Sequence, residues 1–341
     1  MFVPVKTKDG QQLMPMHAAR ARKLVKRGEA TPYWDNGIYC IRLNKAPSNS
    51  ETQDIVVGVD PGSKKEGFTV KSEAHTYLNV QADAHSGVSK KIAKRRELRR
   101  SRRSRKCPNR KNRTNRLANE ERIPAGTRVR WDWKLRILHW LSKLYPVTHV
   151  CVEDIKAETK QYQQRWNQSF SPLEVGKQWF YTEVRKRWQL RTLQGWQTKE
   201  IRDRLGLKKS SKKLSETFDA HCVDSWCLAY HTVGGATIPD TTAIFCILPI
   251  PIKRRCLHRE QPAKGGKRNR YGGTRCLNTV KNALVKHVKH GLLRVSGHQK
   301  GKLTLSGINS SKQVVLQANP EDYKILKRLN FRYKDATTSQ T

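Results

Sequence analysis

Three acidic residues and one histidine in the middle of the chain have the types and surroundings that metal-dependent chemistry needs. Asp60 ends an apolar run that predicts a buried strand, and Glu153 lies in a second such run. His221 and Asp224 are spaced i and i+3, so a helix would place them on one face. Carboxylates that converge on one point repel each other, and divalent cations such as Mg²⁺ or Mn²⁺, which favour oxygen ligands, relieve that repulsion.

Two such ions, roughly 4 Å apart, can hold the attacking and leaving oxygens of a phosphodiester displacement. The sequence therefore predicts a hydrolytic site in which Asp60, Glu153 and Asp224 bind two Mg²⁺ or Mn²⁺ ions, while His221 positions or deprotonates the attacking water. We predict no organic cofactor. Asp154 follows Glu153, and only one of the two can face the site, because neighbouring strand residues point to opposite faces.

The elements that must position these side chains are those of an α/β protein. Apolar runs and turn residues predict strands over 55–60, 67–70, 75–80 and 150–155, and helices over 127–145, 173–190, 195–205 and 216–231. A small N-terminal unit is expected to contain a helix over 18–26 and a hairpin turn at 35–37. Beyond residue 234 the chain becomes rich in Gly, Pro and short strands, which indicates a separate small β domain.

The charge of the chain indicates a polyanionic partner. Its 341 residues include 69 Lys and Arg against 28 Asp and Glu, a formal charge of +41 at pH 7. Nucleic acid is the natural partner, because neutralising its phosphates releases condensed counterions. The chain has no run of about 18 apolar residues and no signal-peptide segment, so we expect no membrane association and a cytoplasmic location.

Basic residues are densest over 90–116, where 15 of 27 positions are Lys or Arg and one is acidic. Such a segment cannot be a core helix, so we expect a long helix stabilised by phosphates around it. A basic helix near residue 20 and a basic stretch near residue 260 are expected to contact nucleic acid too. The residues predicted to do so are Arg20, Arg22, Lys23, Arg95, Arg96, Arg99, Arg100, Arg102, Arg103, Arg105, Arg110, Arg113, Arg254, Arg255, Arg259, Lys267 and Arg268.

In combination, these motifs resemble the RuvC-like, RNase H-fold nucleases of transposon-encoded RNA-guided systems, the IscB and IsrB group. The matching segments are 13–15 (LMP, the N-terminal PLMP domain), 57–63 (VGVDPGS, the first RuvC motif), 94–103 (KRRELRRSRR, the bridge helix), 152–154 (VED, the second motif) and 221–225 (HCVDS, the third). The resemblance favours Glu153 over Asp154 as the site residue. Only 67 residues separate Glu153 from His221, too few for the HNH nuclease domain of IscB, so the closer resemblance is to IsrB.

The resemblance implies an RNase H-like α/β core split by an Arg-rich bridge helix. The expected segments are a PLMP-like domain over 1–50, RuvC-like parts over 54–86 and 121–160, the bridge helix over 87–120, a helical segment with the third RuvC-like part over 161–240, and a basic β domain over 241–341 that reads a target-adjacent motif or holds RNA. It also implies that a guide RNA (omega RNA) directs nicking of the displaced strand of double-stranded DNA. The protein would be a monomer in a prokaryotic ribonucleoprotein, associated with the nucleoid when bound to DNA.

Two other functions are compatible with the residues. One is an unguided junction-resolving or transposition nuclease on the same core, although such a nuclease would not need so long an arginine helix. The other is a non-catalytic RNA-binding protein in which the acids are structural. Acids embedded in a field of positive charge argue against the second alternative.

Overall fold

The computed structural model describes residues 1–85, 87–106, 123–156, 171–212, 214–249, 275–277, 279–308, 310, 312–328 and 331–333. The chain divides into two compact units, Met1–Cys246 and Ile247–Thr341. No helix in the described ranges is long and apolar enough to cross a membrane.

A small sheet and one helix form the N-terminal part of the first unit. The strands β1 (Phe2–Lys6), β2 (Gln12–His17), β3 (Ala30–Asp35) and β4 (Ile38–Leu43) are ordered β2-β1-β4-β3, and α1 (Ala18–Lys26) packs on one face. The hairpin turn between β3 and β4 has positive φ angles at Asn36 and Gly37, as the sequence predicts. The strand β2 was not predicted.

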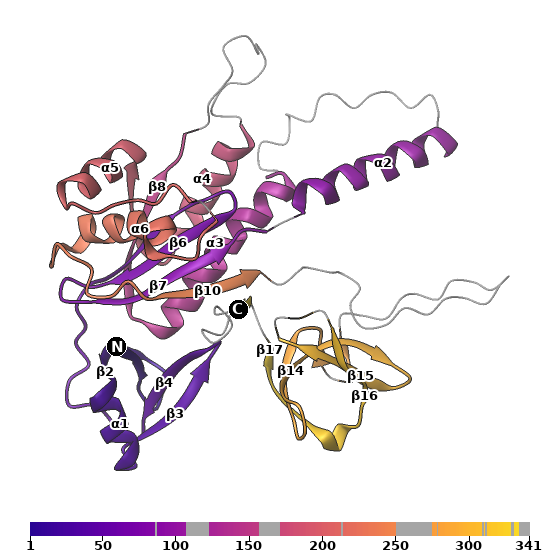
Figure 1. Ribbon diagram of the computed structural model, residues 1–341, viewed down its shortest axis with the longest axis horizontal. Helices are drawn as coiled ribbons and strands as arrows, with labels where there is room; N and C mark the ends of the chain where they lie inside the picture. Colours follow the sequence, from indigo (N-terminus) through magenta and orange to yellow (C-terminus); the bar gives the residue numbers. More distant parts are fainter. Residues whose placement is uncertain are drawn as a thin grey trace, which may run out of the picture. The chain divides into compact units, whose positions relative to one another are not determined.

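The core of the first unit is a mixed sheet. Its strands β5 (Ile55–Asp60), β6 (Lys65–Lys71), β7 (Thr76–Asp83), β8 (Val147–Asp154) and β9 (Gln189–Gln194) are ordered β7-β6-β5-β8-β9 (Figure 1). The first three strands form an antiparallel meander, whereas β5, β8 and β9 are parallel. This strand order and these directions are those of an RNase H-like core, which confirms the predicted fold class at that level.

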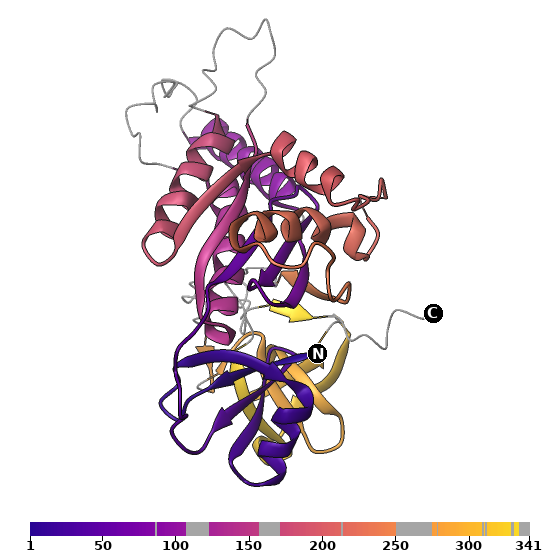
Figure 2. The same cartoon turned by 90° about the vertical axis from the view of Figure 1, so that its left-hand side faces the viewer.

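Helices cover both faces of this sheet (Figure 2). On one face lies α6 (Phe218–Val233), with α5 (Gly195–Arg204) packed beside it. On the other face lie α3 (Ala125–Leu144) and α4 (Pro172–Arg185): Lys134 of α3 pairs with Glu66 of β6, and Lys177 of α4 pairs with Asp154 of β8. The strand β10 (Ile244–Pro249) begins beside β7 and continues into the second unit.

The arginine-rich helix predicted over 90–116 is α2, which spans Val88–Lys106. Residues 107–116 lie outside the described part. The described side chains between residues 92 and 101 are all exposed, as expected for a helix with almost no apolar residues.

The helix predicted over 173–190 is wrong at its C-terminal end. The helix α4 ends at Arg185, and β9 then pairs in parallel with β8 from Gln189. Local pattern favoured a helix here, but the unpaired edge of β8 offers a ladder of backbone hydrogen bonds that a continued helix would leave unmade.

The second unit contains a five-stranded antiparallel sheet ordered β16-β15-β14-β13-β17. Its elements are β11 (Arg275–Cys276), β12 (Thr279–Val280), β13 (Ala283–His287), β14 (Gly291–Gln299), β15 (Lys302–Gly307), β16 (Gln313–Ala318), the 3₁₀ helix η2 (Pro320–Asp322), β17 (Tyr323–Arg328) and β18 (Phe331–Tyr333). An apolar cluster that includes Val285, Val295 and Leu305 forms its core. The predicted C-terminal β structure is therefore present.

Candidate functional site

Two of the predicted site residues lie side by side at the carboxyl ends of adjacent parallel strands. The register pairs Val59 of β5 with Val152 of β8, so Asp60 and Glu153 follow at the same level. Their side chains point to the face that carries α6, because two residues earlier on β5 Gly58 lies against that helix. The β-ladder therefore brings together two carboxyl groups that are 93 positions apart in the sequence.

Two glycines let α6 approach this face of the sheet closely. A Cβ atom added at Gly58 would lie 1.9 Å from the carbonyl oxygen of Ser225, and one at Gly67 would lie 1.9 Å from that of His221. Any side chain at these positions would push the helix away. Because Gly67 pairs with Asp60 across β5 and β6, the contact places the start of α6, including His221, above the row that contains Asp60.

A buried hydrogen bond fixes the helix at this height. The hydroxyl of Ser225 lies 2.8 Å from that of Thr69 on β6. Thr69 in turn donates to the side-chain oxygen of Asn79 on β7, at 3.0 Å. The residue before Ser225 on α6 is Asp224, whose side chain is 3% exposed. The helix that carries Asp224 is thus held close to the sheet. The hydrogen bond between Ser225 and Thr69 fixes it there, and Gly58 and Gly67 leave room for its backbone.

Burial and mutual repulsion shape the charge state of the carboxyl pair. Burial raises the pKa of Asp60 well above its usual range, and the negative charges of Glu153 and Asp224 raise it further. Burial also raises the pKa of Glu153, although a hydrogen bond from the Asp60 carboxyl works in the opposite direction. The two carboxyl groups therefore titrate together, and neither one titrates independently of the other.

Basic side chains offset the charge of Asp224. Arg202 of α5 donates from Nη1 to Oδ1 at 2.5 Å, and Lys209, in the segment between α5 and α6, donates to Oδ2. Burial alone would lower the pKa of Lys209. The hydrogen bond to Asp224 and the charges of Asp224, Asp60 and Glu153 raise it instead. The Lys209 ammonium group is therefore attracted electrostatically by all three carboxylates.

The donor set suits a hard divalent cation. Asp60, Glu153 and Asp224 supply only oxygen atoms, from two strands and a crossing helix, and burial together with the neighbouring carboxylates raises the pKa of Asp60 and of Glu153. Within the described ranges, however, no three His, Cys, Asp or Glu side chains gather closely enough to hold a metal. The structure brings Asp60 and Glu153 together and directs Asp224 toward Arg202 and Lys209.

Asp154 faces away from this site, as alternation along the strand predicts. It pairs with Lys177 at 2.7 Å and accepts hydrogen bonds from Tyr181 at 3.0 Å and from Gln194 at 2.9 Å. Burial would raise its pKa, but these hydrogen bonds lower it overall. Asp154 therefore joins β8 to α4 and to the start of α5.

The side chains predicted to contact nucleic acid are only partly described. Arg20, Arg22 and Lys23 are exposed on α1, and Arg95, Arg96, Arg99 and Arg100 are exposed on α2. Arg102, Arg103 and Arg105 belong to α2, but their side chains lie outside the described part, as do the residues Arg110, Arg113, Arg254, Arg255, Arg259, Lys267 and Arg268. For the described residues, exposure is compatible with the prediction without testing it.

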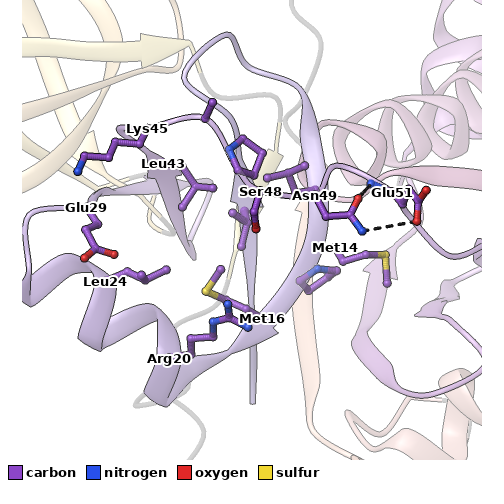
Figure 3. Close-up of a pocket in the computed structure, with 15 residues that line it drawn as sticks. Met14, Met16, Arg20, Leu24, Glu29, Leu43, Lys45, Ser48, Asn49 and Glu51 are labelled. Carbon is purple, nitrogen blue, oxygen red and sulfur yellow. Dashed lines mark hydrogen bonds between the residues drawn. The ribbon is translucent and has the colours of Figure 1, made fainter.

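The N-terminal part contains a separate hollow of about 460 Å³. Met14, Met16, Leu24 and Leu43 are among the apolar residues that line it, and the basic Arg20 lines it as well (Figure 3). None of the four predicted catalytic residues lines this hollow. Residues of the LMP segment therefore build a different concavity from the carboxylate site.

Sequence reasoning missed Arg202 and Lys209. Both lie in basic segments of a chain with 69 Lys and Arg, so nothing in their types or spacing singled them out. Their roles become visible only when the fold places α5 and the following segment beside Asp224.

Comparisons with known proteins add a family and two structures. A model of the family described as RRXRR protein matches residues 3–170, a range that includes Asp60 and Glu153 but ends before α6. The chain is similar to this family over that range. No curated protein matches the chain.

Two of the solved structures that match the chain are of RuvC from Thermus thermophilus. The RuvC complex with a Holliday junction substrate shares 14% identity over 53% of this chain and 97% of its own, with a TM-score of 0.27. A second RuvC structure shares 15% identity over 53% of this chain and 98% of its own, with a TM-score of 0.25. The order and the directions of the strands in the central sheet define the RNase H-like class of the core.

Proposed function

We propose that this chain is a metal-dependent, RuvC-like endonuclease that cuts DNA. The observation that carries the proposal is the placement of Asp60 and Glu153 at the same level of two parallel strands, with Asp224 on the helix that crosses them. The RRXRR family, a family of RuvC-like nucleases associated with transposons, supports it through the match over residues 3–170.

The carboxylates, the histidine and the arginine of the site have different roles in this proposal. Asp60, Glu153 and Asp224 would hold two Mg²⁺ or Mn²⁺ ions, which when bound supply Lewis acidity toward water and phosphate. His221, one helical turn before Asp224 and 8% exposed, would orient the attacking water or accept its proton. Arg202 would hold the Asp224 carboxylate in its orientation.

We further propose that an RNA guides the cut and that the product is a nick in the displaced, non-target DNA strand. Support comes from the exposed arginines of α2, since the planar guanidinium group binds phosphate bidentately and a helix of them suits the backbone of a guide–target duplex. The 67 residues between Glu153 and His221 leave no room for an inserted second nuclease domain, which favours a nick over a double-strand break. The guide would be an omega RNA.

The test is to express the gene with its native flanking DNA and sequence the RNA that copurifies with the protein. One discrete structured RNA with a separable guide segment, followed by guide-dependent nicking of matching plasmid DNA in Mg²⁺, is the expected result. A mixture of cellular RNAs together with guide-independent cutting of branched DNA would overturn RNA guidance and favour the unguided nuclease. Specific RNA without any cutting would favour a non-catalytic RNA-binding protein.

A further inference from the structure

Trp196 is a large aromatic side chain that the fold leaves exposed beside the carboxylate site. It is the second residue of α5, and its side chain is 66% exposed. Single exposed apolar residues are common on protein surfaces, so exposure by itself carries no inference. What distinguishes Trp196 is its place on the first turn of α5, next to the residue that meets Glu153.

Several contacts fix the start of α5 at the end of β8. Gln194, the last residue of β9, pairs with Asp154 in the sheet and donates from its side chain to the Asp154 carboxylate at 2.9 Å. The side chains and backbone of Gln194 and Gln197 form a reciprocal cap on the helix. The first turn of α5 is therefore held to the strand that carries the catalytic carboxylate.

Glu153 itself lies against this first turn. A Cβ atom added at Gly195 would lie 3.0 Å from Oε1 of Glu153. Gly195 is therefore the residue of α5 that meets the Glu153 carboxylate. The Cα atom of Trp196 lies about 3.8 Å from that of Gly195, because consecutive Cα atoms have this spacing. The exposed Trp196 is thus next in the chain to the residue that meets Glu153, while Thr198 and Ile201 of the same helix are buried.

The chemistry of this border suits a nucleobase. Three carboxylates repel the phosphates of a substrate strand, so that strand needs attractive contacts just outside the site. An indole offers a flat apolar face on which a base can stack, and Lys199, exposed one turn further along α5, offers a cation for a neighbouring phosphate. Stacking on a side chain requires a base whose face is not covered by its own neighbours, which indicates a single strand rather than a duplex.

We propose that Trp196 is the stacking platform for a base of the single DNA strand that enters the carboxylate site, next to the phosphate to be cut. The inference builds on the proposed nuclease function and extends it, because it names the form of the substrate and a surface that positions it. Trp196 acts here as a binding residue and makes no contact with the reacting atoms.

The test uses the full chain carrying Asp60→Asn, so that bound strands stay intact, and short single-stranded DNA with 2-aminopurine at each position in turn. Stacking on the indole quenches the fluorescence of 2-aminopurine at the contacted position. We expect Trp196→Ala to abolish that quenching and to weaken binding about 5- to 150-fold, from about 1–3 kcal/mol per stacked base. Trp196→Phe should retain most of both.

Trp34 supplies the matched control, because it is also 66% exposed but lies in the N-terminal sheet. Trp34→Ala should quench and bind like the parent protein. The inference is overturned if Trp196→Ala quenches as the parent does, if Trp34→Ala has the same effect as Trp196→Ala, or if an RNA strand of the same sequence binds the platform more tightly than DNA.

The two proposals can fail separately. Nuclease function is read from cutting by the protein with Asp60 restored, whereas the platform is read from fluorescence in the inactive background. Cutting without Trp196-dependent quenching removes the platform and leaves the nuclease. Trp196-dependent quenching without any cutting removes the nuclease and leaves a single-strand binding surface.

Discussion

Lys209→Met should increase the affinity of the carboxylate site for divalent cations. In the structure the Lys209 ammonium group donates to Asp224 and is attracted by Asp60 and Glu153 as well. It therefore supplies part of the positive charge that a bound metal ion would supply. Once it is removed, Arg202 remains as the basic partner of Asp224 among the described residues.

The size of the effect follows from the exposure of this side chain, which is 40%. An ion pair with this much solvent contact contributes about 0.2–1 kcal/mol. The attraction to the other two carboxylates adds a comparable amount, so the total penalty on a competing cation is about 1.4 kcal/mol, or roughly tenfold in Kd.

The Kd of the protein for Mn²⁺ can be measured without nucleic acid, either by titration calorimetry or from the paramagnetic signal of free Mn²⁺. Lys208→Met is the control, because Lys208 is the exposed neighbour and its loss changes the net charge by the same amount. We expect Lys209→Met to bind Mn²⁺ about tenfold more tightly than Lys208→Met. Equal or weaker binding by Lys209→Met would refute the idea that its ammonium group competes with metal.

Two further predictions concern the packing and the charge of the same site. Gly67→Ala should lower the free energy of unfolding by about 1–3 kcal/mol and reduce cutting, because the added methyl group meets the carbonyl of His221. Denaturant unfolding measures the first effect, and Gly297→Ala, whose methyl group would meet Thr304 at an ordinary 3.7 Å, should be close to neutral; equal losses in both variants would contradict the close approach of α6. The second prediction follows from the raised pKa values of Asp60 and Glu153, which mean that the folded chain binds protons more tightly than the unfolded chain. Without divalent ions, their contribution to stability is therefore greatest at low pH and is lost as pH rises from an ordinary carboxyl pKa of about 4 toward the raised value. As pH rises over that range, the free energy of unfolding of the parent protein should fall relative to that of Asp60→Asn. A rise relative to Asp60→Asn would contradict the raised pKa of Asp60.

The elements that bear the site could largely be predicted from sequence. Apolar runs ending in acids identified β5 and β8, and alternation along the strand assigned Glu153 and Asp154 to opposite faces. The spacing of His221 and Asp224 identified one face of α6. These features are local, so residue type and period are enough to reveal them.

What sequence did not reveal depends on contacts between distant segments. The strand β9 forms because it pairs with the open edge of β8. The residues of β9 alternate too weakly between apolar and polar to predict a strand from sequence. The ion pairs of Asp224 with Arg202 and Lys209 depend on how α5 packs against α6. Likewise, the importance of Gly58 and Gly67 appears only once a helix backbone is found against them.

The most direct test of the central claim compares two neighbouring carboxylates on β8. Glu153→Gln and Asp154→Asn each remove one charge, but Glu153 faces Asp60 whereas Asp154 is held by Lys177 on the other face. Mg²⁺-dependent cutting of DNA by the purified complex should be lost in Glu153→Gln and in Asp60→Asn, with the protein still folded and bound to nucleic acid. Asp154→Asn should still cut, with a lower melting temperature. Full cutting by Glu153→Gln, or loss of cutting only in Asp154→Asn, would contradict the site.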